Sequence, residues 1–239
     1  CDSLSSIVVD KNNKVYDSRH KCNAIIETKS SKVIAGCAAS KLVEGLKEIG
    51  DLAFQGIQLS EIVISKSMTQ ISAEAFYDCD ALSRITVNKD NPKYESPGGC
   101  NAIIRKDSDI LVLGCPNTII PKRVKEIGCH AFYGRPVAKK TLCLPDGLTS
   151  IGEGAFSHCD NLFEIIIPQS VTSIGEGAFI NCPNLAVVQI LGLIRELKES
   201  VFLGCEKLAL VDIPESVSII RQRVFYNCKN LVYVNLPTS

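Results

Sequence analysis

The chain has 239 residues, of which 46% are hydrophobic and 22% are charged, with 26 basic and 26 acidic side chains. A disordered chain would have fewer apolar residues and a larger net charge, so this composition indicates a folded protein with a sizeable core. The formal charge of zero excludes the basic footprint expected of a nucleic-acid-binding protein. No apolar stretch approaches the about 20 residues that cross a bilayer, so we expect no membrane insertion in this segment.

A long repeat occupies the first half of the chain. Residues 1–54 align with residues 79–132 at an offset of 78 without a gap, and 24 of these 54 pairs are identical. In each copy, "KCNAIIETKSSKVIAGC" (21–37) and "GCNAIIRKDSDILVLGC" (99–115), two apolar runs surround a polar turn. That pattern predicts a β-hairpin. We therefore predict two hairpin inserts, in residues 10–37 and 88–115.

An Asp- and Asn-rich segment begins each insert, "DKNNKVYD" at residues 10–17 and "NKDNPKYE" at residues 88–95. Their oxygen-bearing side chains have a spacing similar to that of a calcium-binding loop, but the central Gly and the terminal Glu of such a loop are absent. Turns in which an Asp or Asn side chain accepts main-chain hydrogen bonds are the favoured interpretation.

A shorter repeat fills the second half, where "IGEGAFSHCDNLFEIIIPQSV" (151–171) is followed by "IGEGAFINCPNLAVVQILGLI" (174–194). Each unit has Phe, usually Cys three residues later, Leu three residues after that, and then an alternating apolar run. A period of 20–29 residues with one short strand predicts a solenoid in which stacked coils share one core. We expect one parallel sheet on one face, with strands ended by Pro145, Pro168, Pro214 and Pro237.

The repeat "SVTSIGEGAF..C..L..I.IP" resembles the BspA-like leucine-rich repeats of bacterial and some protist cell-surface proteins, and "CNAII....LI.GC" resembles the hairpin insert of that family. The resemblance covers essentially the whole chain and is weakest at residues 38–46 and 135–143. It implies a leucine-rich-repeat solenoid over residues 1–239, mostly β with short 3-10 or helical turns. Because the chain starts and stops inside a repeat, whereas solenoids have polar caps, we expect a fragment of a longer protein.

Twelve cysteines divide into three groups. Cysteines at the repeated position after Ala-Phe are predicted to be buried thiols that pack as small apolar groups. Cys22 with Cys37, and Cys100 with Cys115, flank the hairpins, so each pair is a candidate either for a disulfide or for two free thiols. Cys129 and Cys143 follow no repeat position. The repeated cysteines are Cys1, Cys79, Cys159, Cys182, Cys205 and Cys228.

No motif in the sequence indicates catalysis, a metal or a cofactor. Cysteine and histidine are not clustered at zinc spacing, and no GxSxG nucleophile motif occurs. The segment "IGEGAF" lacks the Lys of a phosphate-binding loop, and its glycines favour a tight turn. His20, His130 and His158 occupy different repeat positions and are predicted to be exposed or half-packed. We therefore predict a non-enzymatic protein.

The strand register predicts which side chains face outward on the sheet. Ile166, Val187, Leu210 and Tyr233 are apolar and successive, and Glu164, Gln189, Asp212 and Asn235 surround them. Such a patch is typical of a protein contact; the alternatives are β-propensity alone, or cover by a flanking repeat or loop. The other predicted outward residues are Ser6, Val8, Glu61, Val63, Arg84, Thr86, Thr141 and Cys143.

Two functions follow from this sequence. The resemblance implies a secreted or cell-surface scaffold that binds proteins or glycoproteins of a host or a partner cell. The alternative is a spacer or stalk that presents another domain. The absence of N-x-S/T glycosylation motifs favours a bacterial source.

Overall fold

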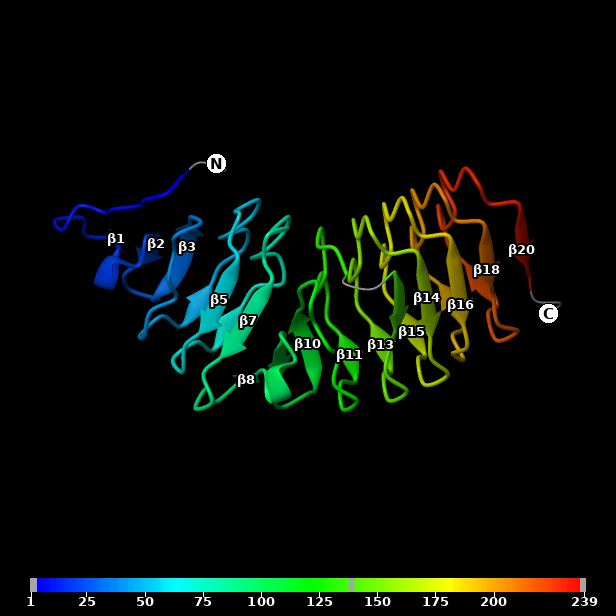
Figure 1. Cartoon of the computed structure of the whole chain (residues 1–239), viewed down its shortest axis with the longest axis horizontal. Coiled ribbons are helices and arrows are strands. Elements are labelled where there is room, and N and C mark those ends of the chain that lie inside the picture. Colours follow the sequence, from blue (N-terminus) through cyan, green and yellow to red (C-terminus); the bar gives the residue numbers. More distant parts are fainter. Residues whose placement is uncertain (1–3, 138–139, 237–239) are drawn as a thin grey trace.

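The structure is a computed structural model that describes residues 4–137 and 140–236. Short strands and turns wind into coils that stack in chain order along one axis, with the first coils at one end and the last at the other (Figure 1). The described elements are β1 Tyr16–Asp17, η1 Arg19–Lys21, β2 Ala24–Glu27, β3 Lys32–Gly36, β4 Glu48–Ile49, β5 Glu61–Ile64, β6 Gln70–Ile71, β7 Arg84–Val87, β8 Tyr94–Glu95, η2 Pro97–Gly99, β9 Ile103–Arg105, β10 Ile110–Leu113, β11 Glu126–Ile127, β12 Thr141–Cys143, β13 Ser150–Ile151, β14 Glu164–Ile167, β15 Ser173–Ile174, β16 Val187–Ile190, β17 Glu196–Leu197, β18 Leu210–Asp212, β19 Ile219–Ile220 and β20 Tyr233–Asn235.

The predicted parallel sheet is present in the second half, where β12, β14, β16, β18 and β20 lie side by side. Alternate side chains of these strands point into the core, and Ile165, Val188 and Val211 are buried there. Pro168 directly follows β14, and its carbonyl accepts a hydrogen bond from Val171 N at 3.0 Å, which starts the turn. Pro145 and Pro214 act in the same way, whereas Pro237 lies outside the described residues.

The parallel sheet predicted on one face is present, but it is divided into two parts and a second face also has parallel pairing. β5 and β7 form a separate two-stranded parallel sheet, because the second hairpin insert separates β7 from β12. A second face also carries parallel ladders, made of two-residue strands such as β11, β13 and β15. These strands were too short to give an alternating pattern in the sequence.

The third side of each coil is the turn around Ala-Phe, and it carries no helix. Main-chain hydrogen bonds join successive turns here, for example Phe156 N to Ala178 O at 2.8 Å and Phe179 N to Val201 O at 3.0 Å. At every stacked Phe except Phe76, the residues two before and two after the Phe have positive φ, as at Gly154 (55°) and His158 (58°). This left-handed conformation explains the second glycine of "IGEGAF", Gly154, because glycine adopts it without steric cost. The first glycine, Gly152, is required by close main-chain contact, since a Cβ there would lie 2.6 Å from Cys129 N.

The core is built from columns of equivalent residues. Phe156 stacks on Phe179 with ring centroids 5.5 Å apart, and the stack runs from Phe132 to Phe225. A separate pair, Phe54 and Phe76, stacks at 5.3 Å. Among the described residues, no stack joins Phe76 to Phe132. The buried residues accordingly form two clusters, one mainly in the first half and one mainly in the second.

The repeated cysteines form another column, and each has the same main-chain partner. The Cys182 thiol donates a hydrogen bond to Phe156 O, the carbonyl of the preceding coil, at 3.0 Å. The same bond recurs at Cys79, Cys159, Cys205 and Cys228. All but Cys228 are fully buried, as predicted, while Cys1 lies outside the described residues. No pattern in the sequence indicates this hydrogen bond.

Arg135 replaces cysteine in this column at the break between the two Phe stacks. Its side chain is 1% exposed, and its guanidinium donates to Phe76 O at 2.7 Å, the equivalent carbonyl of the preceding coil. It also donates to Ala131 O at 2.7 Å. The longer side chain thus reaches the carbonyl where the coils are not joined by stacked rings.

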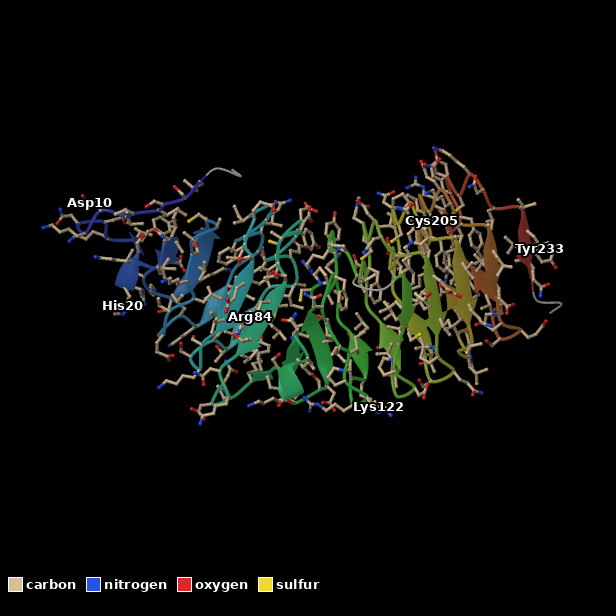
Figure 2. All side chains as sticks on the ribbon, in the orientation of Figure 1. Asp10, His20, Arg84, Lys122, Cys205 and Tyr233 are labelled. Atoms are coloured by element: carbon tan, nitrogen blue, oxygen red, sulfur yellow. The ribbon has the colours of Figure 1, made fainter. Side chains whose placement is uncertain are left out.

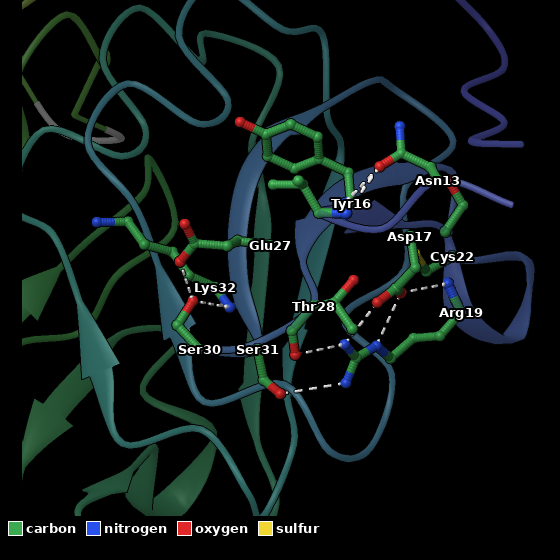
Figure 3. A network of polar contacts seen from close by, with 12 residues as sticks. Asn13, Tyr16, Asp17, Arg19, Cys22, Glu27, Thr28, Ser30, Ser31 and Lys32 are labelled. Atoms are coloured by element: carbon green, nitrogen blue, oxygen red, sulfur yellow. Dashed lines mark hydrogen bonds and ion pairs between the residues drawn. The ribbon is translucent and has the colours of Figure 1, made fainter. Parts of the chain in front are cut away.

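Both hairpin inserts occur as predicted, and the offset of 78 relates them. β1, β2 and β3 pair antiparallel, as do β8, β9 and β10, and β3 and β10 then pair in parallel with β4 and β11. The Asp- and Asn-rich segments are side-chain turns, since Asn13 Oδ1 accepts from Val15 N and Asn91 Oδ1 from Tyr94 N. In the first insert, Arg19 pairs with Asp17 and also donates to Ser31 Oγ (Figure 3). The hydrogen bond from the Arg19 side chain lowers the pKa of Asp17 to about 2.

The hairpins lie so close to the Phe rings that glycine is required at one position in each. A Cβ on Gly114 would lie 2.1 Å from Phe132 Cε1, and a Cβ on Gly36 would lie equally close to Phe54 Cε1. We expect Gly114→Ala to lower the free energy of unfolding by about 1–3 kcal/mol, because the ring must move out of its stack. Chemical denaturation measures this, with Ser108→Ala on the exposed hairpin turn as the control. Equal stability of the two variants would contradict the close contact.

Candidate functional site: the outer face of the sheet

Two rows of outward side chains cross the sheet in register. Glu164 is opposite Val187, which is opposite Leu210, which is opposite Tyr233. In the neighbouring row, Ile166, Gln189, Asp212 and Asn235 are aligned in the same way. The structure therefore brings together all eight residues predicted for the binding face, on four adjacent strands.

The exposure of the apolar residues increases toward the C-terminal end. Ile166 and Val187 are half-buried, whereas Leu210 is 49% and Tyr233 65% exposed. Tyr233 lies on the last strand at that end (Figure 2). Gln189, Asp212 and Asn235 are exposed beside them. The result is an apolar row, here called the sheet-face row (Val187, Leu210 and Tyr233), bordered by uncharged and acidic polar groups.

The remaining outward positions do not extend this face. Ser6 and Val8 are exposed but belong to no strand, so their predicted place in the sheet was wrong. Glu61, Val63, Arg84 and Thr86 lie on the separate β5–β7 sheet, where Arg84 and Glu61 approach to 3.9 Å. Thr141 and Cys143 do adjoin the face on β12, and Thr141 Oγ1 donates to Glu164 Oε2 at 2.9 Å.

Two clefts, which the sequence reasoning missed, open beside the first strand of each of these sheets. The β5 cleft has a volume of ≈ 450 Å³ and lies between β5 and residues 38–43. The β12 cleft has a volume of ≈ 350 Å³ and lies between β12 and residues 115–120. Phe54 and Phe132, related by the offset of 78, line the two clefts. The resemblance to the repeat family is weakest at residues 38–46 and 135–143, and both segments contribute residues to the cleft walls. This weak resemblance was the one sign of the clefts in the sequence.

The hairpin cysteines are free thiols in the structure. Ala24 is opposite Gly36, so the next pair along the hairpin is Asn23 with Cys37, and Cys37 Sγ donates to Asn23 O at 3.5 Å. Cys115 Sγ likewise donates to Asn101 O at 3.5 Å. Cys22 and Cys37, and likewise Cys100 and Cys115, are therefore offset by one residue from direct opposition in the hairpin. Disulfide formation stays a prediction, and the register favours free thiols.

Histidines and acidic groups form no reactive arrangement in the part of the chain that the structure describes. His130 packs against the rings of Tyr77 at 5.0 Å and Tyr133 at 5.7 Å, and burial lowers its pKa. His158 contacts Tyr133, whereas His20 is exposed. Within residues 4–137 and 140–236, no three metal-ligating side chains lie close enough together to bind an ion. No described helix is long and apolar enough to cross a membrane.

Comparisons with solved structures give the same architecture. A leucine-rich repeat protein from Eubacterium ventriosum is 25% identical, with a TM-score of 0.69, over 83% of this chain and 60% of its own. A leucine rich cell surface protein from Faecalibacterium prausnitzii is 32% identical, with a TM-score of 0.57, over 79% of this chain and 45% of its own. A leucine-rich repeat protein from Bacteroides ovatus is 26% identical, with a TM-score of 0.52, over 98% and 54%. This chain thus spans about half the length of these proteins.

The family model agrees with these structural similarities. No curated protein matches the chain. Residues 25–96 and 114–232 match the BspA type leucine rich repeat region in six copies. The match includes every stacked Phe, whereas β9 and β10 of the second hairpin lie in its gap. The chain belongs to the BspA-type leucine-rich repeat family.

Proposed function

We propose that this protein is a non-enzymatic scaffold of the cell surface or extracellular space that binds a protein or glycoprotein through the outer face of β14 to β20. The observation that carries the proposal is the sheet-face row, in which Leu210 and Tyr233 expose apolar surface on adjacent strands. An exposed aromatic beside aliphatic residues, with polar side chains around them, is the composition of a protein contact. Similarity to a leucine rich cell surface protein supports the location.

The rigidity of the solenoid supports a binding surface of this kind. Coil-to-coil hydrogen bonds on the sheet face, the short-strand face and the Ala-Phe turns hold the outward side chains in fixed rows. A surface that is already ordered loses little conformational entropy on binding. A protein or glycoprotein is proposed as the partner because the row lacks the basic charge that nucleic-acid binding needs.

The proposal predicts that charge on the sheet-face row removes binding without unfolding the protein. Val187→Glu and Leu210→Glu, together with Glu164→Lys beside them, are measured by surface plasmon resonance against immobilised extracellular matrix glycoproteins. We expect at least a tenfold loss of affinity, since burying an unpaired carboxylate in the contact is costly. All three side chains point outward from the sheet, and surface substitutions usually change stability by about 0.5 kcal/mol or less, so thermal unfolding should stay similar.

Leu193→Glu is the matched control, because Leu193 is exposed but lies outside the sheet. It should bind like the unmodified protein. A spacer or stalk, the alternative function, predicts that no glycoprotein is bound and that every variant behaves alike. Undiminished binding by Val187→Glu and Leu210→Glu would refute the sheet-face site.

A further inference from the structure

The β5 cleft and the β12 cleft occupy equivalent places in the long repeat. In each, the hairpin strand leads into an irregular segment, residues 38–43 or 115–120, where a regular coil would place a strand of the sheet. The sheet therefore begins again at β5 and at β12, and each of these strands has one sheet neighbour among the described residues. The same local architecture therefore occurs twice in the chain.

The main chain of each edge strand points hydrogen-bonding groups toward its cleft. Arg84 N donates to Ser60 O and Asn88 N donates to Ile64 O, so the even-numbered residues of β5 face β7. Main-chain groups alternate between the two edges of a strand, so the N–H and C=O groups of Glu61 and Val63 face the β5 cleft. On β12, Glu164 N donates to Lys140 O, so the even-numbered residues face β14. By the same alternation, the N–H and C=O groups of Thr141 and Cys143 face the β12 cleft. In the described structure these groups have no main-chain partner.

The opposite edge of the β5–β7 sheet is closed by the protein itself. The Asn101 side chain donates from Nδ2 to Ser83 O at 2.8 Å and accepts from Ile85 N at 2.6 Å. This side chain replaces the main chain of a neighbouring strand. An unpaired strand edge promotes association with other chains, and proteins usually cover it. The protein covers the β7 edge but leaves the β5 edge open beside a cleft.

The apolar lining of each cleft is suited to the alternate side chains of an added strand. Phe54, Leu59 and Ile62 line the β5 cleft, and Phe132, Val137 and Leu142 line the β12 cleft. Volumes of ≈ 450 and ≈ 350 Å³ fall within the range of about 300–1,000 Å³ that ligand pockets show. A strand laid along β5 would direct alternate side chains to this apolar interior.

We propose that each cleft binds an extended peptide segment, with apolar side chains at alternate positions, by adding it as a strand to β5 or β12. Main-chain pairing supplies affinity in this mode of recognition, and pockets for alternate side chains supply specificity. The site is distinct from the sheet-face row and does not depend on it. It gives the protein two equivalent peptide sites per chain.

The test uses a short capped peptide of alternating valine and threonine, carrying a fluorophore, and two isomers of it. One isomer is N-methylated at every valine and the other at every threonine, so each lacks the main-chain donors of one edge. Fluorescence anisotropy gives affinity and stoichiometry, and NMR amide shifts locate the site. We expect two sites per chain, shifts at Glu61, Val63, Thr141 and Cys143, and a loss of about tenfold or more for one isomer only.

Protein variants test the same pairing from the other side. Val63→Pro removes the N–H that faces the cleft and keeps the β5–β7 hydrogen bonds, since proline is tolerated on an edge strand. It should reduce the stoichiometry from two to one, and the further change Cys143→Pro should remove binding. Val63→Thr, which keeps the N–H, is the matched control. Thermal unfolding establishes that each variant is folded.

Several outcomes overturn the proposal. Equal binding of both methylated isomers would mean that the clefts take apolar groups without strand pairing. Full stoichiometry in Val63→Pro, or no binding by the unmodified protein at millimolar peptide, would also exclude it. Loss of peptide binding in the Val187→Glu and Leu210→Glu variants would place the peptide on the sheet-face row instead. That last result would support the proposed function while removing the cleft site, so the two failures are distinguishable.

Discussion

Arg135→Ala is expected to lower the free energy of unfolding by about 3 kcal/mol, within the range for truncation of large buried side chains. Arg135 is almost fully buried at the break between the two Phe stacks, where it bonds Phe76 O of the preceding coil. Truncation leaves a cavity at this junction and removes three hydrogen bonds to carbonyl oxygens. Each bond from a charged donor is worth about 1.5–3 kcal/mol, and relief from burying the guanidinium offsets part of that loss.

Two further variants separate packing from hydrogen bonding at Arg135. Arg135→Met fills most of the space but donates nothing, so its stability should lie between that of Arg135→Ala and the unmodified protein. Cys159→Ala, one coil further along the same column, removes only a thiol and should cost about 1 kcal/mol. Chemical denaturation gives the three values, and hydrogen exchange shows whether the loss is local to the junction. If Arg135→Ala proves no less stable than Cys159→Ala, the junction does not rely on the guanidinium.

Cys159 is expected to react about a thousandfold more slowly with an alkylating reagent in the native protein than after unfolding. Cys143 and Cys129 are exposed, whereas Cys159 is fully buried. Burial raises the pKa of Cys159 to about 12 and that of Cys79 to about 11. At pH 8 a cysteine thiol of the unfolded chain, with a pKa of about 8.5, is roughly one quarter thiolate, whereas a thiol with a pKa of about 12 is roughly one part in ten thousand thiolate. Because the thiolate is the reactive form, buried thiols react slowly even before access is considered.

Pulsed alkylation followed by peptide mass spectrometry measures this difference for each cysteine. Cys129 and Cys143 should label first, and the column cysteines only after unfolding in denaturant. The same digest, made without reductant, resolves the hairpin pairs. We expect Cys22, Cys37, Cys100 and Cys115 as separate alkylated peptides, because Asn23 and Asn101 take the positions opposite Cys37 and Cys115. A peptide cross-linked through Cys22 and Cys37 would show that the hairpin shifts its register on oxidation.

Repetition made most of the fold and the sheet face predictable. One residue type at one spacing defines a column of the core. Alignment of the repeats therefore predicts the Phe stack, the buried Leu and Cys positions, and the register of Val187 with Leu210. Departures from the repeat were harder to interpret. Arg135 lies three residues after Phe132, at the position where the other repeats have Cys. The role of arginine at this position becomes clear only from the spacing of the coils at the break, which its side chain spans to reach Phe76 O.

The sequence by itself determined the coil, its core columns and the two hairpins. Side-chain alternation and repeat length are local properties of the sequence, and stacking repeats the same arrangement in each coil. The tertiary structure alone decided where the stack is interrupted, which strand edges stay open and which thiols pair with carbonyls. Those features depend on distances between coils that are far apart in the chain. At the β5 edge, the inserted hairpin leads into an irregular segment in place of a neighbouring strand. The residues of β5 itself contain no pattern that indicates the missing strand.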